Sequence, residues 1–243
     1  MKHTLTRIPI FLLLFTLFWV FLLAIVISMG YYDSFLWLNS FRTSWLDVSM
    51  PHITHLGDGV LLGSFTALVL ARKRPEIGIG ILISLVLVSI TIALLKGQVF
   101  PDWERPLTVF KDGPFFYFIG LKALKFNSFP SGHSAAAAVV CTWLAWIATP
   151  KVWPQILWAA VGILVCYSRT YIGVHFPADI LVGSLIGVGV FILTISVILP
   201  PISNRLKRQS PQRERRTIII LVGLMGVLFI GDIIRLYTEF YQG

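Results

Sequence analysis

Charged residues and cysteines are scarce in this chain. Charged residues make up 13% of its 243 residues, about half of the roughly 25% that is usual in a soluble domain. The two cysteines, Cys141 and Cys166, both fall within apolar stretches, so the sequence offers neither a disulfide framework nor enough soft ligands for a metal site. We interpret both as small core residues. The sequence also has no internal repeat, low-complexity tract or glycine-rich nucleotide-binding loop.

Long apolar runs dominate instead. Hydrophobic residues make up 56% of the chain, and the mean hydropathy is +0.82. Apolar runs of about 18 or more residues are typical of membrane spans, so the sequence predicts a protein that crosses a membrane several times. We expect spans at about residues 8–29, 57–71, 77–96, 132–149, 153–168, 178–199 and 217–236.

The pattern predicts a single integral membrane domain over residues 1–243, with an all-α fold of about six to seven transmembrane helices. Residues 1–56 would hold a retained first span, because the run lacks the small-residue cleavage site of a signal peptide. Within them, residues 31–56 mix aromatic and polar residues, which is typical of an interfacial helix. Residues 97–131 would form a long loop of the kind that is usually functional, and residues 217–236 would add a C-terminal span.

The formal net charge of +9 raises the question of a nucleic-acid partner. Most of the excess lies in short segments beside apolar runs, which is how topology-setting charge is distributed. We therefore exclude nucleic acid and expect these segments to meet anionic membrane lipids. A cytoplasmic N-terminus places most of the 20 basic residues inside, as the positive-inside rule expects. The inside residues would be Lys2, Arg7, Arg72, Lys73, Arg74, Lys151, Arg205, Lys207, Arg208, Arg213, Arg215 and Arg216.

A first polar cluster, Pro130-Ser131-Gly132-His133, precedes the apolar run 135–148. Ser131 is a good helix N-cap, and Gly132 allows a ligand to approach the backbone closely. A helix N-terminus has unpaired N–H groups and a positive dipole end, so it binds phosphate readily. His133 would reach that site from the first turn. The alternative is a capped membrane helix with an interfacial histidine.

A second cluster lies in the segment 168–179, whose sequence is SRTYIGVHFPAD. Pro177 suits the first position of a new helix, and the spacing of His175 and Asp179 lets their side chains meet across one turn. A carboxylate on one imidazole nitrogen fixes the tautomer and leaves the other nitrogen as a nucleophile or base. The planar fork of Arg169 matches phosphate oxygens. Ionisable groups at a membrane are costly and usually functional, which favours a site over an incidental ion pair.

Two further groups are more ambiguous. Lys96 ends a predicted span shortly before Arg105, and it could serve a site or extend to the interface as a snorkelling side chain. His52, His55 and Asp58 gather before another span and could bind zinc. We interpret them instead as polar residues at a helix start, with Asp58 near the positive end of the dipole. We expect no metal site.

Together the clusters resemble the three signature motifs of the type 2 phosphatidic acid phosphatase (PAP2) superfamily, which includes bacterial lipid phosphatases, glucose-6-phosphatase and vanadium haloperoxidases. The family's second motif, PSGH, is complete at 130–133, and its third, SR-x5-H-x3-D, is complete at 168–179. Its first motif is usually K-x6-RP. Here eight residues separate Lys96 from Arg105-Pro106, so this motif is two residues longer than the family pattern.

The resemblance covers about residues 57–200, the expected PAP2-like core. It implies that His175 is the nucleophile that forms a phosphohistidine and that Asp179 orients it. It implies that His133 is the general acid that protonates the leaving oxygen. Phosphoryl transfer needs positioning and charge stabilisation, which cations could supply here without a metal or cofactor. The residues implied to hold the phosphate oxygens are Lys96, Arg105, Ser131, Gly132 and Arg169.

The resemblance therefore implies a membrane lipid phosphatase. The distribution of Lys and Arg predicts that its site lies at the outer face, and the compact chain with an outward site indicates a bacterial inner membrane with the site on the periplasmic side. The enzyme would hydrolyse a lipid phosphate monoester or pyrophosphate, such as undecaprenyl pyrophosphate, phosphatidylglycerophosphate, phosphatidic acid or a lipid A phosphate. One alternative is a lipid phosphotransferase with an acceptor other than water. Another is a non-catalytic lipid transporter or binding protein, against which His133 and the pair His175 and Asp179 argue, because binding needs only cations. We infer no obligate protein partner.

Overall fold

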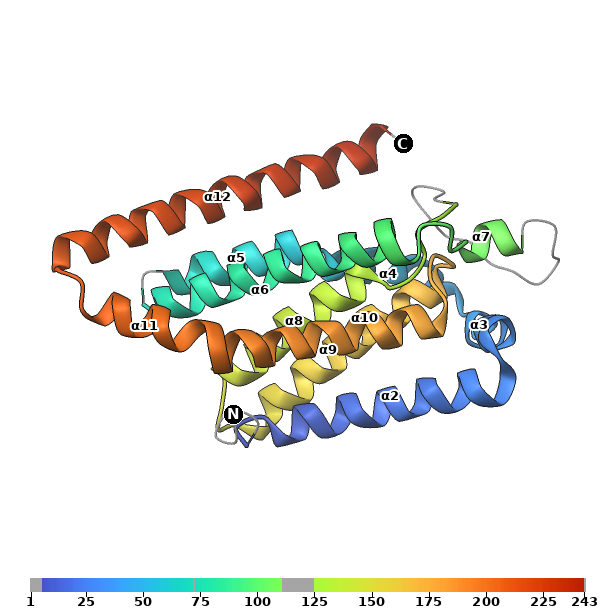
Figure 1. Cartoon of the computed structure of the whole chain (residues 1–243). Coiled ribbons are helices and arrows are strands. Elements are labelled where there is room, and N and C mark those ends of the chain that lie inside the picture. The colour runs from blue at the N-terminus through green and yellow to red at the C-terminus, as the bar shows by residue number, and fades with distance from the viewer. Residues whose placement is uncertain (1–5, 72, 111–124, 243) are drawn as a thin grey trace.

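The computed structural model describes residues 6–71, 73–110 and 125–242, in which all regular secondary structure is helical (Figure 1). The all-α prediction is confirmed. The helices are α2 (Pro9–Met29), α3 (Tyr31–Asn39), α4 (Ser44–Ile53), α5 (Gly59–Ala71), α6 (Pro75–Leu94), α7 (Pro106–Val109), α8 (Gly132–Ile147), α9 (Val152–Tyr171), α10 (Pro177–Leu193), α11 (Leu199–Lys207) and α12 (Pro211–Gln242). Irregular helical turns follow α4 at Thr54–Gly57, α6 at Leu95–Val99 and α10 at Thr194–Ile198.

Every expected span coincides with a helix, but the number of spans is not confirmed. Over the described residues, four helical segments are long and apolar enough to cross a membrane. They are Pro9–Met29, Pro75–Val99, Pro177–Lys207 and Arg215–Ile234. A fifth span arises only if Ser44–Gly57 and Leu61–Leu70, which meet at 54°, are counted together. The expected spans within α8 and α9 are not, each by itself, both long and apolar enough to be counted among these segments.

The reason lies in where α8 and α9 sit. Helix α8 packs against α10 and α9 and also contacts α5 and α6, so protein rather than lipid surrounds it. Its 16 residues would span about 24 Å at 1.5 Å per residue, less than the roughly 30 Å of a bilayer core. Helix α9 carries polar side chains inward. Gln155 Oε1, for example, accepts hydrogen bonds from the N–H groups of Ile10 (3.2 Å) and Phe11 (3.4 Å) at the start of α2.

Glycines hold α10 unusually close to α8. A Cβ added at Gly183 would lie 2.3 Å from the carbonyl oxygen of Ser131, and one added at Gly187 would lie 2.2 Å from that of Ala135. Small residues four apart let membrane helices approach this closely. The close approach allows Ser131 N–H to donate to the carbonyl of Asp179 at 3.0 Å. It therefore brings the two complete sequence motifs into contact.

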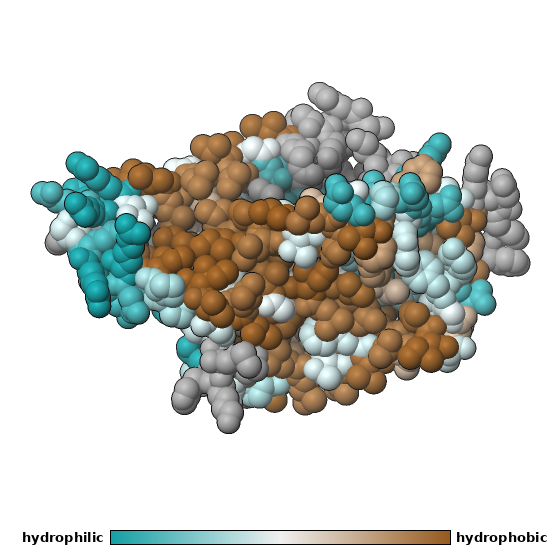
Figure 2. Space-filling model, in the orientation of Figure 1, coloured by the Kyte–Doolittle hydropathy of each residue, from teal (hydrophilic) through white to brown (hydrophobic). Residues whose placement is uncertain are grey.

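The two ends of the bundle differ. Figure 1 shows the end of α6, the start of α8 and the start of α10 at one end, together with α3, α4 and α7. The turn between α11 and α12 lies at the other end, and Figure 2 shows hydrophilic residues gathered there, beside a broad hydrophobic band. Arg205, Lys207 and Arg208 belong to this second end. The assignment of that end to the cytoplasm stays a prediction.

Both segments expected between spans contain helices in the residues that the structure describes. Residues 31–56 form α3 and α4, which pack against α9, with α3 also contacting α10. They were expected to form a single interfacial helix. The expected loop 97–131 contains the rest of the turn after α6 and the short helix α7, and its residues 111–124 lie outside the described residues.

The packing of α10 on α8 predicts that Gly187→Ala destabilises the protein. The new methyl group would overlap the backbone of α8, and overpacking of this kind costs about 1–3 kcal/mol. Gly189 is a matched control on the same helix, because a Cβ there meets nothing within 4 Å. Thermal unfolding in detergent should show a lower melting temperature for Gly187→Ala and an unchanged or higher one for Gly189→Ala. Equal melting temperatures for the two variants would contradict this account of the interface.

Candidate active site

The centre of the site is the pair formed by His175 and Asp179. Helix α10 begins at Pro177, so His175 lies just before it and Asp179 lies in its first turn. His175 Nδ1 is 3.1 Å from Asp179 Oδ2, and both side chains are buried. The backbone N–H of His175 donates to the carbonyl of Arg169 (3.2 Å), and its carbonyl accepts from the Thr170 hydroxyl (3.1 Å). These two bonds fix the backbone of His175, and Asp179 orients its ring.

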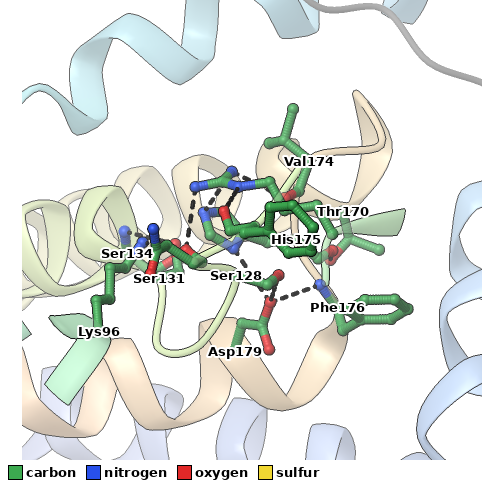
Figure 3. Close-up of polar contacts among 12 residues, drawn as sticks. Lys96, Ser128, Ser131, Ser134, Thr170, Val174, His175, Phe176 and Asp179 are labelled. Carbon is green, nitrogen blue, oxygen red and sulfur yellow. Dashed lines mark hydrogen bonds and ion pairs between the residues drawn. The ribbon is translucent and has the colours of Figure 1, made fainter. Parts of the chain in front are cut away.

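Four donors surround the carboxylate of Asp179, and Figure 3 labels three of them, His175, Ser128 and Phe176. Besides His175, its Oδ2 accepts from the Ser128 hydroxyl at 2.5 Å and from the backbone N–H of Phe176 at 3.1 Å. Its Oδ1 accepts from the Tyr31 hydroxyl at 2.7 Å. Hydrogen bonds to a buried carboxylate favour its charged form and offset the cost of removing it from water. A charged carboxylate at this place accepts a hydrogen bond from Nδ1–H of His175, and in that tautomer Nε2 carries the lone pair.

Arg105 lies beside that second nitrogen. Its Nη1 is 3.5 Å from His175 Nε2 and donates to the carbonyl of Val174 at 3.2 Å. Its Nε donates to the carbonyl of Phe126 at 3.0 Å, and only 6% of the residue is exposed. The guanidinium is thus fixed by backbone carbonyls next to the nitrogen that would attack phosphorus.

Lys96 and Arg105 meet at one backbone carbonyl. Lys96 Nζ donates to the carbonyl of Asn127 at 2.8 Å, and Arg105 Nη2 donates to the same oxygen at 3.3 Å. Asn127 has a φ of 57°, a left-handed conformation that asparagine tolerates better than most residues. The lengthened first motif therefore still brings its lysine and arginine together.

Ser131 caps helix α8. Its Oγ accepts from Ser134 N–H at 3.3 Å and from the Ser134 hydroxyl at 2.9 Å. A hydroxyl can accept two hydrogen bonds and donate one, so the proton of Ser131 remains able to reach a phosphate oxygen. The next two residues, Gly132 and His133, line a cavity of about 340 Å³ between α5, α6 and α8, with mostly apolar neighbours such as Leu85.

Thr54 holds one end of the Arg169 guanidinium. Its Nη1 donates to Thr54 Oγ1 at 2.5 Å. Its Nε is buried and has no hydrogen-bond partner in the part of the chain that the structure describes. A buried donor without a partner costs free energy, so this nitrogen is suited to receive an anionic ligand.

The surroundings of His175 keep it uncharged. Burial lowers the pKa of its imidazole well below the usual 6.5, and nearby positive charge lowers it further. The contributing groups are, in decreasing order, Arg105, Lys96, Arg169 and His133. Burial also lowers the pKa of Arg105, while Asp179 acts to raise it. A neutral imidazole among cations is the protonation state that a nucleophile at a phosphate site needs.

The structure thus brings His175, Asp179, Arg105, Lys96 and Arg169 into one electrostatic cluster, with Ser131, Gly132 and His133 at its edge. Among the described residues there is no group of three or more His, Cys, Asp or Glu side chains that could hold a metal ion. His52, His55 and Asp58 accordingly form no such group.

Sequence analysis missed several partners of these groups. Tyr31, Thr54 and Asn127 lie outside the motifs, and their roles depend on tertiary contacts that spacing does not predict. Ser128 carried a weak signal, because it lies just before the PSGH motif and its hydroxyl could have been expected to face the same site.

Comparison with known proteins identifies the family of this chain. The model of the PAP2 superfamily matches residues 77–203. An undecaprenyl-diphosphatase of Sulfolobus acidocaldarius is 31% identical over 161 residues, which cover 66% of this chain and 74% of that protein.

Two crystal structures are similar as well. That of Aquifex aeolicus LpxE has a TM-score of 0.59 and 29% identity, covering 68% of this chain and 94% of that one. That of a transmembrane PAP2-type phosphatidylglycerolphosphate phosphatase from Bacillus subtilis has a TM-score of 0.54 and 26% identity, covering 81% and 97%. The family model, the relative and both folds lead to one conclusion: the chain belongs to the PAP2 superfamily.

Proposed function

We propose that this protein is a membrane lipid phosphatase that works through a phosphohistidine on His175. The observation that carries the mechanism is the buried pair of His175 and Asp179, with Arg105 3.5 Å from the remaining nitrogen. Membership of the PAP2 superfamily and relatives named as phosphatases of lipid phosphates support the reaction class. A binding protein would need the cations but not this pair.

In the first step, His175 Nε2 donates its lone pair to phosphorus while the bond to the leaving oxygen breaks. His133 gives its proton to that oxygen, which departs as the lipid product. The cations Arg105, Lys96 and Arg169 stabilise the charge on the phosphoryl oxygens. Asp179 holds the Nδ1 proton and stabilises the positive charge that develops on the ring.

In the second step, water attacks the phosphorus of the phosphohistidine. His133, now neutral, accepts a proton from that water, and the bond between phosphorus and Nε2 breaks. Phosphate leaves, and both histidines return to their starting protonation states. Chain groups supply the charge stabilisation in each step, so the mechanism needs no metal.

The lipid moiety leaves on the side of His133. The cavity beside His133 is lined mostly by apolar side chains, including Val88, Ile92 and Ala136, which suits the start of a hydrocarbon chain. The relatives are named for undecaprenyl diphosphate, phosphatidylglycerophosphate and lipid A 4'-phosphate. The substrate of this chain belongs to the same class, a lipid phosphate monoester or pyrophosphate.

The two histidines should respond differently to the leaving group. A lipid alkoxide is basic and needs a proton, and general-acid help is worth about 10²–10⁴-fold, whereas a nitrophenolate leaves unaided. Where p-nitrophenyl phosphate is accepted and phosphorylation of His175 limits the rate, His133→Ala should therefore lose far more activity on a lipid monophosphate than on p-nitrophenyl phosphate, while His175→Ala should lose nearly all activity on both. Phosphate release by purified protein measures this, with His52→Ala as a histidine control. Identical losses for His133→Ala and His175→Ala on both substrates would refute the assigned roles.

Activity should survive removal of metal ions, because Arg105, Lys96 and Arg169 supply the positive charge. Phosphate release is measured with and without EDTA after dialysis against chelator, and orthovanadate should inhibit in both conditions as an analogue of the transition state. Activity that disappears in EDTA and returns with magnesium or zinc would show that a metal takes part.

The site should face away from the cytoplasm. Ser40 and Ser210 are exposed and lie at the site end and at the turn between α11 and α12, so they offer a matched pair of serine-to-cysteine variants. The native cysteines are fully buried and give little background. In intact spheroplasts an impermeant thiol reagent should label Ser40→Cys and spare Ser210→Cys. The reverse pattern would place the site on the cytoplasmic side.

A further inference from the structure

We propose that residues 31–57, which we name the N-terminal collar, position the catalytic groups of the segment 168–179. The collar lies outside the region 77–203 that the family model matches. Tyr31 would position the pair of His175 and Asp179, and Thr54 would position Arg169. This inference rests on the proposed function, because it assigns the collar a part in that same reaction.

The contact of Tyr31 is direct. Its hydroxyl donates to Asp179 Oδ1 at 2.7 Å, and this is the bond that the collar contributes to the carboxylate. The Tyr31 ring is held in place by its own neighbours, with its centroid 4.4 Å from that of Phe176 and 5.7 Å from that of Trp103. Phe176 adjoins His175 in the chain, so the collar packs against the turn that carries the nucleophile.

The contact of Thr54 concerns the phosphate-binding arginine. Thr54 is 5% exposed, and its Oγ1 accepts from Arg169 Nη1. This bond fixes one end of the planar guanidinium and leaves the buried Nε without a partner in the described residues. A fixed guanidinium loses less freedom when it binds an anion, so Thr54 should strengthen phosphate binding.

Between these two points the collar binds the end of α9. Asn39 Nδ2 donates to the carbonyls of Thr170 (3.1 Å) and Tyr171 (2.9 Å), and Arg42 Nη1 donates to that of Tyr171 (2.8 Å). The last carbonyls of a helix lack partners within the helix, and the collar supplies them. Asp47 Oδ1 forms a salt bridge with Arg42 Nη2 at 2.8 Å and accepts a hydrogen bond from the Tyr171 hydroxyl at 2.6 Å.

The link continues to the nucleophile. The Thr170 hydroxyl donates to the carbonyl of His175 at 3.1 Å, so the residue whose carbonyl Asn39 binds also fixes the backbone of the histidine. The collar therefore contacts the catalytic segment at a carboxylate, at a guanidinium and at the backbone between them. A segment that only covered the bundle would not need polar contacts at all three places.

Loss of the Tyr31 hydroxyl has a predictable electrostatic effect. Asp179 would lose one of its four donors, its charge would be less dispersed, and it would stabilise the protonated form of His175 more strongly. The pKa of His175 should rise from its depressed position, and the acid limb of kcat/KM should move to higher pH. The other groups that face His175 stay in place in this variant, namely Arg105, Lys96, Arg169 and His133.

The first test compares Tyr31→Phe with Tyr32→Phe, which removes the neighbouring hydroxyl and keeps the ring. The usual strength of a hydrogen bond to a charged group corresponds to about 10–100-fold in rate, so kcat of Tyr31→Phe on p-nitrophenyl phosphate should fall by about that factor with little change in KM. Its acid limb should move upward, and Tyr32→Phe should match the unmodified protein in both respects. Loose packing alone would lower the amount of folded enzyme without moving the pH profile.

The second test compares Thr54→Val, which removes the hydroxyl at similar size, with Thr54→Ser, which keeps it. Calorimetric titration with orthovanadate should show about tenfold weaker binding for Thr54→Val and nearly unchanged binding for Thr54→Ser. This readout does not depend on turnover, so it tests the collar even if the protein releases no phosphate from lipids, a result that would overturn the proposed function alone. The proposed role of the collar would be overturned if Tyr31→Phe kept its kcat and pH profile and Thr54→Val kept its affinity for vanadate.

Discussion

The buried carboxylate of Asp179 is the constraint on which the rest of the site depends. A charge removed from water is stable only if hydrogen bonds replace its hydration. Here α3, the segment before α8 and the residue that precedes α10 each supply a donor, namely Tyr31, Ser128 and Phe176. These elements must meet at one point to keep the carboxylate charged. The proposed mechanism needs that charge, because it is what lets His175 present Nε2 to a phosphate.

The packing of the helices brings these donors to the carboxylate of Asp179. Gly183 and Gly187 let α10 approach α8 closely enough for Ser131 to bind the backbone of Asp179. Helix α8 is enclosed by other helices, which allows it to be short, whereas α9 turns polar side chains such as Gln155 inward and leaves Leu157 and Leu164 exposed. Lipid-facing helices such as α2 lack that freedom. The architecture thus keeps charged groups inside protein near one end of an apolar bundle.

Local features of this molecule were predictable, and distant ones were not. The helices, the Ser131 cap and the approach of His175 to Asp179 follow from patterns within one helix or turn, so the sequence predicted them. The number of spans was not predictable in the same way, because hydropathy does not tell whether lipid or protein surrounds α8. Tyr31 and Thr54 bind residues more than a hundred positions away, and single-sequence spacing carries no information about such pairs. The left-handed conformation of Asn127 was not predicted. Its carbonyl matters only because Lys96 and Arg105 both donate to it in the folded protein.

The most direct test of the account is to trap the covalent intermediate. The unmodified protein would be mixed with a substrate whose phosphate is radiolabelled, quenched rapidly in alkali and mapped by mass spectrometry, beside His133→Ala and His175→Ala. The account predicts an alkali-stable, acid-labile phosphoryl group on His175. It predicts a longer-lived label in His133→Ala, where the base for hydrolysis is missing, and none in His175→Ala. Turnover without any label, or a label on another residue, would contradict the central claim.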